Sequence, residues 1–171
     1  MSDVEKILFT ACATLIGGVV LLVMTELLKV FVIAPAQKTR EQIQIVLSRV
    51  DFYSNKLTNF FSAEPTEQEI DVIKSITKDL REAATDLKSN YTLVPMKKFL
   101  SLIKVLPNQE RIDVAFTGLI YLHNSILYEG RRDYIANLVE MNDNEINRIH
   151  AALTDKSVPE RLNPIGQAHK R

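Results

Sequence analysis

A stretch of nineteen residues without a single charge, residues 7–25, lies near the start of this 171-residue chain. As a helix rising about 1.5 Å per residue it would be roughly 28 Å long, close to the ~30 Å hydrocarbon core of a bilayer. A cleavable signal peptide usually has a shorter apolar core, of ~7–15 residues. A buried core helix is the alternative, but a chain of this size has little else to cover such a segment on every side. We therefore expect a retained transmembrane helix.

Basic residues are concentrated after the apolar stretch. Only Lys6 precedes it, whereas four basic residues follow it closely: Lys29, Lys38, Arg40 and Arg49. The positive-inside tendency then places the C-terminal part in the cytoplasm, with the N-terminus outside, as in a single-pass protein of the bacterial inner membrane. The only cysteine, Cys12, has no disulfide partner within the chain, which agrees with a reducing compartment.

The junction after the span contains Glu26 and Lys29, three residues apart, and then "VFVIAP". The two charges can form an ion pair at the membrane boundary, or Glu26 can face other copies of the chain. We expect Pro35 to kink or end the helix as it leaves the membrane.

Small residues recur every four positions in the apolar stretch. Such spacing lets two membrane helices approach closely. We therefore predict a homo-oligomer of two-fold or four-fold symmetry, whose membrane contacts involve Thr10, Thr14, Gly18, Ala13 and Gly17.

The remaining chain has the three- and four-residue apolar spacing of amphipathic helices and no competing strand pattern. We predict an all-α fold with an N-terminal transmembrane helix followed by a cytosolic helical bundle of about five helices. The expected domains are an anchor over residues 1–35, a helical domain over 36–153 and a flexible basic tail over 154–171.

The expected helices of the cytosolic domain follow from caps, breaks and periodicity. Residues 36–61 suit a stalk, and Thr66 with Glu69 is a capping box that starts the next helix, which ends near "KSNYT". Pro95 suits the first turn of a short helix that ends before Pro107. Helices are expected over about 109–128 and 132–153, and the polar "NDNE" is a candidate break in the last one.

No enzyme signature is present. The sequence has no glycine-rich phosphate loop, no zinc-binding Cys/His spacing and no HExxH, and Ser125 near His123 is too weak a case for a nucleophile and its base. We expect no catalysis, no metal and no cofactor.

Segment 88–104 contains four lysines and no acidic residue, in a chain whose formal net charge is zero. Adjacent lysines at a helix start favour an anion, and an aromatic ring can stack on a base. The candidate residues for an anionic nucleotide are therefore Lys97, Lys98, Asn90, Tyr91 and Lys104. The same lysines also suit a helix near anionic lipid, or a merely solvated basic face.

A second candidate site is "GLIYLHNSIL", residues 118–127, where His123 and Asn124 follow apolar residues at helical spacing. Buried polar groups need partners, so these side chains either form hydrogen bonds in the core or line a pocket for a polar ligand. Arg131 and Arg132 follow at the expected turn and are further candidates for ligand binding.

Four segments together carry a resemblance to known proteins: "FVIAPAQ", "DFYSN", "LREAATDL" and "GLIYLHNS". Over most of residues 7–128 the chain resembles a set of small bacterial membrane proteins with one span and a helical cytosolic domain. More distantly, its architecture is similar to the membrane effectors of type III CRISPR antiphage defence. That resemblance implies an oligomer, a cyclic oligoadenylate bound by the cytosolic domains, and membrane disruption as output. The candidate residues above come from charge and chemistry alone.

Three functions therefore stand as hypotheses: a ligand-gated membrane effector, a passive anchor that recruits a protein partner, and a membrane-bound enzyme. The first is preferred. The expected partners are the lipid bilayer, further copies of the chain and cyclic oligoadenylate, and we expect no duplex nucleic acid.

Overall fold

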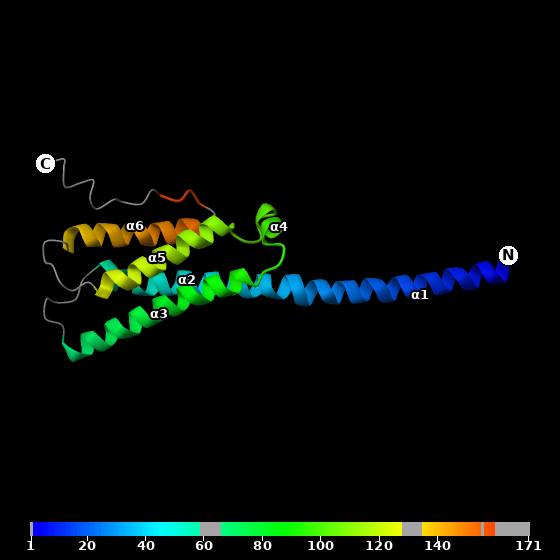
Figure 1. The fold of residues 1–171 in the computed structure, drawn as a ribbon, viewed down its shortest axis with the longest axis horizontal. Coiled ribbons are helices and arrows are strands. Elements are labelled where there is room, and N and C mark those ends of the chain that lie inside the picture. Colours follow the sequence, from blue (N-terminus) through cyan, green and yellow to red (C-terminus); the bar gives the residue numbers. More distant parts are fainter. Residues whose placement is uncertain (1, 59–65, 128–134, 155, 160–171) are drawn as a thin grey trace.

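The computed structural model describes residues 2–58, 66–127, 135–154 and 156–159, and these form helices and short connections without a strand. The all-α prediction is therefore confirmed. The elements are α1 (Asp3–Leu28), a π-helical segment η1 (Lys29–Ile33), α2 (Ala34–Thr58), α3 (Glu67–Thr92), α4 (Lys97–Leu102), α5 (Gln109–Leu127) and α6 (Ile135–Leu153) (Figure 1).

One uninterrupted helix runs from Asp3 to Thr58 through α1, η1 and α2. The expectation that Pro35 ends the helix is wrong. Proline has no N–H to donate, and its ring clashes with the carbonyl four residues earlier in a regular α-helix. The π-helical segment lies directly before Pro35, and the Ala34 N–H donates to the Lys29 carbonyl, five residues back. This wider turn changes the local register, so that the helix continues past the proline.

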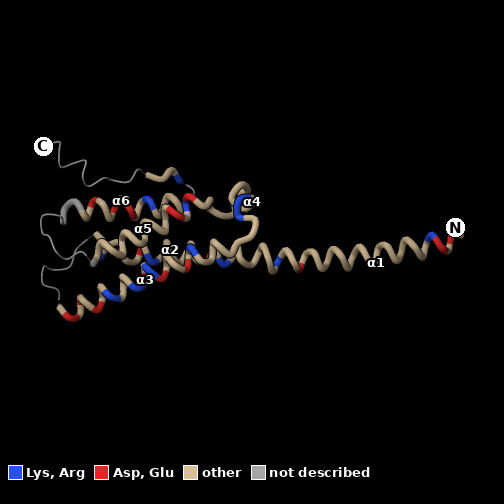
Figure 2. Tube along the Cα trace, in the orientation of Figure 1, with Lys and Arg blue, Asp and Glu red and all other residues tan. Residues whose placement is uncertain are grey.

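None of the residues of α1 is buried. Within the described residues, this is the one helix long and apolar enough to span a membrane. It extends away from the other helices (Figure 1), and its charges lie only near its two ends (Figure 2). The first buried side chain along the chain is that of Ala36, at the start of α2.

Helices α2, α3, α5 and α6 form a bundle with consecutive helices antiparallel (Figure 1). Helix α3 packs against α2 and α5, and α6 packs against α5 and α2, so the four surround one core. Each helix contributes an apolar stripe at three- and four-residue spacing. The fully buried aliphatic side chains include Val46, Val50, Leu57, Ile76, Leu80, Leu87, Ile112, Leu119, Leu122 and Ile149.

Helix α3 begins where the sequence predicts. The Thr66 hydroxyl accepts a hydrogen bond from the Glu69 N–H at 3.3 Å, and the Glu69 carboxylate accepts one from the Thr66 N–H at 2.8 Å. These two bonds satisfy donors that a helix start otherwise leaves without partners. The capping box is therefore confirmed.

The "NDNE" segment does not break the last helix. Residues 142–145 lie inside α6, and Asn142 and Glu145 are both buried. The Asn142 Nδ2 donates to the Leu57 carbonyl at 2.7 Å, near the end of α2. A polar side chain is tolerated inside the bundle because it has this partner on a neighbouring helix.

Candidate functional site

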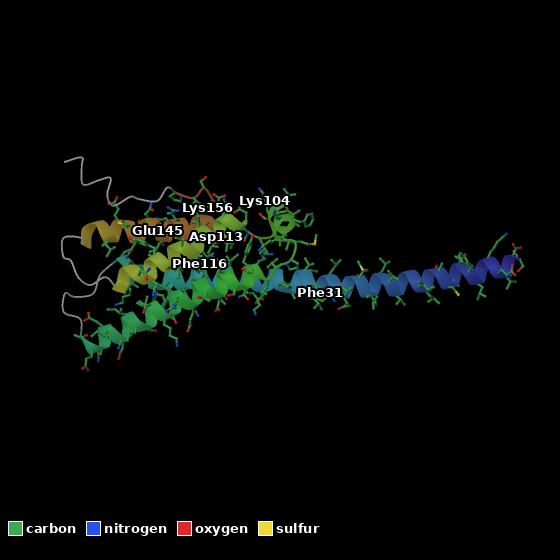
Figure 3. All side chains as sticks on the ribbon, viewed as in Figure 1. Phe31, Lys104, Asp113, Phe116, Glu145 and Lys156 are labelled. Carbon is green, nitrogen blue, oxygen red and sulfur yellow. The ribbon has the colours of Figure 1, made fainter. Side chains whose placement is uncertain are left out.

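The lysines of segment 88–104 do not form one basic site. Lys88 forms an ion pair with Asp113 of α5 at 3.6 Å, and its Nζ lies 4.3 Å from the centroid of the Phe116 ring. Figure 3 labels Asp113 and Phe116 beside the end of α3. Residues 88–104 include no acidic residue, but the fold places Asp113 beside Lys88. This carboxylate neutralises part of the positive charge of the segment.

The predicted stacking partner, Tyr91, is buried, with 2% of its surface exposed. Its hydroxyl donates to the Pro107 carbonyl at 3.1 Å, and Lys97 Nζ lies 5.4 Å from the ring centroid. Burial, and then the Asp113 charge, raise the pKa of Tyr91. The ring therefore packs in the core and against Lys97, and it has no face open for a base. The neighbouring Asn90 is half-buried.

Helix α4 is six residues long and starts after Met96, a non-glycine residue with a φ of 53° and no side-chain cap. Pro95 precedes this helix rather than occupying its first turn. Lys98 and Lys104 are exposed and Lys97 is half-buried. Large apolar side chains are exposed around them: Leu93, Met96, Phe99, Leu102 and Ile103. The surface is therefore mixed, apolar as well as basic.

His123 is half-buried between α5 and α3. Its Nδ1 lies 2.9 Å from the Thr77 carbonyl oxygen. Because a carbonyl only accepts, Nδ1 carries a proton in this contact. This agrees with the expectation that His123 forms a hydrogen bond inside the fold. Asn124 is exposed, so its expected place on an apolar face is wrong: it lies at the solvent edge of α5.

His123 also lines an open groove of about 520 Å³ on the surface of α3. The other lining residues are Lys74, Thr77, Lys78, Arg81, Glu82, Thr85 and Asp86. Three cations and two carboxylates give this groove a net charge of +1 when His123 is neutral. Lys78 lies 3.8 Å from Glu82, and Lys74 lies 3.6 Å from Asp71, so carboxylates neutralise part of the charge of both lysines. The size of the groove suits a small molecule, and its cations suit an anionic group.

Sequence reasoning missed the α3 side of this groove. Lys74, Lys78 and Arg81 follow one another at four and three residues, which places them on one helical face. That spacing was available in the sequence. What the sequence lacked was the packing of α5 beside α3, which brings His123 to the same groove.

The residues predicted for self-association lie on the open surface of α1. The Thr10 and Thr14 hydroxyls donate to the carbonyls of Lys6 and Thr10, both at 2.9 Å. A Cβ added at Gly17 or Gly18 would meet nothing within 4 Å. This surface is available for contacts between copies. Ala13 lies on the same exposed helix.

At the junction, Lys29 Nζ forms an ion pair with Glu26 Oε1 at 3.1 Å, and both side chains are exposed. The expected ion pair is therefore present, and the contact of Glu26 with other copies of the chain stays a prediction. Arg131 and Arg132 lie outside the described residues. Within the described residues, no group of three or more His, Cys, Asp or Glu side chains is placed to hold a metal ion.

Comparisons with protein-family models, curated proteins and solved structures find no match to this chain.

Proposed function

We propose that the chain is a single-span membrane effector, with its N-terminus outside the bacterial inner membrane and its bundle in the cytosol. In this proposal the bundle binds an anionic ligand, and the α1 helices of a homo-oligomer change their packing in the membrane in response. One observation carries it: the helix that supplies α2 to the bundle core continues without a break into the unburied apolar helix α1.

This continuity couples the two parts mechanically. The bundle holds α2 through fully buried side chains such as Val46 and Val50. Because a continuous helix is stiff along its length, we expect repacking of α2 to move α1 as well. The π-helical segment Lys29–Ile33 lies between the parts, and such segments occur frequently at functional sites.

A ligand can drive such a change only if it binds one arrangement better than the other. The groove between α3 and α5 is the better-formed place for it, because Arg81, Lys74 and Lys78 face it together with His123. A cyclic oligoadenylate, the ligand implied by the resemblance to defence effectors, supplies several phosphates for these cations. Symmetry in the oligomer would present the same groove more than once.

The native Cys12 in α1 allows a direct experiment, because it is the only cysteine in the chain. Full-length protein in lipid nanodiscs would be titrated with cyclic oligoadenylates of different ring size, and oxidative crosslinking through Cys12 would report how the α1 helices pack. We expect one ring size to bind and to change the crosslinking rate at least several-fold.

Variants then locate the site. Arg81→Gln should abolish binding and the crosslinking response, whereas Arg40→Gln, at an exposed position on α2, should preserve both. If the doubly changed Lys97→Glu, Lys98→Glu protein loses binding and Arg81→Gln retains it, the sequence-based candidate is correct and the groove is not the site. If the unchanged protein neither binds nor responds, the function as a passive anchor for a protein partner replaces this proposal.

A further inference from the structure

The segment Leu93–Lys104 exposes an unusual amount of apolar surface for a water-facing element. Leu102 is 79% exposed and Leu93 72%, and the side chains of Met96, Phe99 and Ile103 are at least half exposed. Exposed large apolar residues elsewhere in the bundle, such as Phe52, are scattered. Contiguous apolar surface of this kind usually marks an interaction site, whereas single exposed residues are normal.

The position of α4 in the fold indicates which surface its apolar side chains contact. Helix α4 lies at the end of the bundle from which α1 leaves, beyond the adjoining ends of α3 and α5 (Figure 1). Phe31, which is 62% exposed, lies on the outgoing helix, and Lys104 lies beside α4 at the same end (Figure 3).

The length of the junction sets how far this end can lie from the bilayer. The uncharged stretch ends at Thr25, and the Glu26–Lys29 pair marks the boundary. From Lys29 to Ala36, the first buried residue, the helix rises only about 10 Å. The headgroup layer on one side of a bilayer is about 5–8 Å thick, from the difference between total and hydrocarbon thickness. A spanning α1 therefore places this end of the bundle at the headgroups.

The charge of the segment fits an anionic membrane surface. Lys97, Lys98 and Lys104 accompany the exposed apolar side chains, and residues 88–104 contain no acidic residue. Apolar side chains beside lysines are the composition of elements that lie in a membrane interface, with the apolar groups below the headgroups and the ammonium groups among the phosphates.

The backbone holds α4 in a defined orientation. Met96, directly before α4, and Lys104, two residues after it, have φ values of 53° and 57°, which non-glycine residues rarely adopt. Such conformations persist when the surrounding structure enforces them. Here Val94, Leu100 and Leu106 are buried and fasten the segment to the core, while the apolar side chains of Leu93, Met96, Phe99, Leu102 and Ile103 remain exposed.

From these observations we infer that α4 and its flanks form a membrane-surface element that docks into the headgroup layer of an anionic bilayer. The inference depends on α1 spanning that bilayer, as proposed above. Docking gives the bundle a second attachment besides α1, fixes its tilt on the membrane and assigns Lys98 and Lys104 to lipid phosphates rather than to a nucleotide.

Site-specific fluorescence on the full-length chain tests this inference. In a Cys12→Ala background, an environment-sensitive dye would be attached at Leu102→Cys in α4, at Leu15→Cys in α1, or at Val72→Cys. Val72 is exposed and lies in the second turn of α3, which begins at the end of the bundle far from α1 (Figure 1). Each protein would be placed in vesicles of neutral phosphatidylcholine, alone or mixed with anionic phosphatidylglycerol, that contain lipids with a nitroxide quencher near the headgroup or deep in the chains.

We expect the Leu102 dye to be quenched by the shallow nitroxide in anionic vesicles, the Leu15 dye by the deep nitroxide, and the Val72 dye by neither. Changing Lys97, Lys98 and Lys104 to Gln should reduce the docked-to-undocked ratio at Leu102. The removal of each lysine charge should lower it about fivefold, the equivalent of the ~1 kcal/mol expected for a basic residue near an anionic surface.

The outcomes separate this inference from the proposed function. If the Leu15 dye is quenched but the Leu102 dye behaves like the Val72 dye, α1 spans the membrane and α4 does not dock. If the Leu102 dye is unquenched and Leu102→Cys forms disulfides between copies, a second copy covers α4, and the inference is wrong. If the Leu15 dye is not quenched, the span itself is refuted.

Discussion

Replacing Gly118 with alanine tests how closely α5 and α6 pack. A Cβ built at Gly118 would lie 2.7 Å from Ile149 Cγ1, 3.1 Å from Ile149 Cδ1 and 3.3 Å from Glu145 Oε2. The first distance is shorter than real Cβ contacts allow. Ile149 is fully buried, and its Cγ1 lies next to the branched Cβ of a residue that has one preferred rotamer in a helix. The methylene therefore cannot move aside cheaply.

Two opposing terms set the size of the effect. Alanine in place of glycine inside a helix gains about 1 kcal/mol of intrinsic helix stability. Overpacking a well-filled core typically costs about 1–3 kcal/mol. We therefore expect Gly118→Ala to lower the free energy of unfolding of the bundle by about 1 kcal/mol, although the same change would stabilise an unobstructed helix.

The assay is urea unfolding of the full-length chain in detergent micelles, followed by circular dichroism, combined with a double-mutant cycle. Ile149→Ala removes both obstructing carbons and by itself costs about 2–5 kcal/mol. In that background Gly118→Ala should become stabilising, by up to about 1 kcal/mol. A coupling energy between the two substitutions close to zero, or stabilisation by Gly118→Ala alone, would show that Gly118 and Ile149 do not pack as closely as the structure indicates.

Three further predictions concern caps, protonation and assembly. Thr66→Ala should lower the free energy of unfolding by about 1 kcal/mol through loss of the α3 cap, while Thr66→Ser should largely retain it, as measured by the urea midpoint. A hydrogen bond from Tyr53 to Asp79, and then burial, raise the pKa of Tyr53 above its ordinary value of 10.0. Its contribution to stability is therefore complete below about pH 10 and is lost as the pH rises through the raised pKa, so stability should fall more steeply there in the unchanged protein than in Tyr53→Phe. Gly18→Leu should weaken self-association in detergent, measured by light scattering, whereas Val20→Leu should leave it unchanged. If the unchanged protein is monomeric at micromolar concentration, the predicted oligomer is contradicted.

Local signals in the sequence are enough to predict those helix ends that depend on hydrogen bonds between neighbouring residues. The capping box of Thr66 and Glu69 places the start of α3 because both hydrogen bonds join residues three apart. Pro35 gave the wrong expectation because its effect depends on the turn before it, and a π-helical turn has no strong sequence signature. Asn142 and Glu145 gave the wrong expectation of a break because their burial depends on partners such as the Leu57 carbonyl, 85 residues away.

The candidate site was less predictable because it depends on which helices are neighbours. Tyr91 and Lys88 suit nucleotide binding in sequence, but the fold turns Tyr91 into the core and places Asp113 beside Lys88. Conversely, Lys74, Lys78 and Arg81 share one face of α3 in the sequence, but the groove also needs His123, which the packing of α5 beside α3 brings to it. The sequence predicts the short helix before Pro107, but the exposure of its apolar side chains at the α1 end of the bundle (Figure 1) is a tertiary property.

The topology of the full chain in a bacterial membrane is the most direct test of the central claim, that α1 spans the bilayer and holds the bundle on the cytosolic side. Reporters would be fused after Arg171: a fluorescent protein that folds only in the cytosol, and an alkaline phosphatase that is active only outside it. We expect fluorescence, no phosphatase activity, and a protein that stays in the membrane fraction after carbonate extraction. An active phosphatase fusion, or release of the protein by carbonate, would contradict the claim.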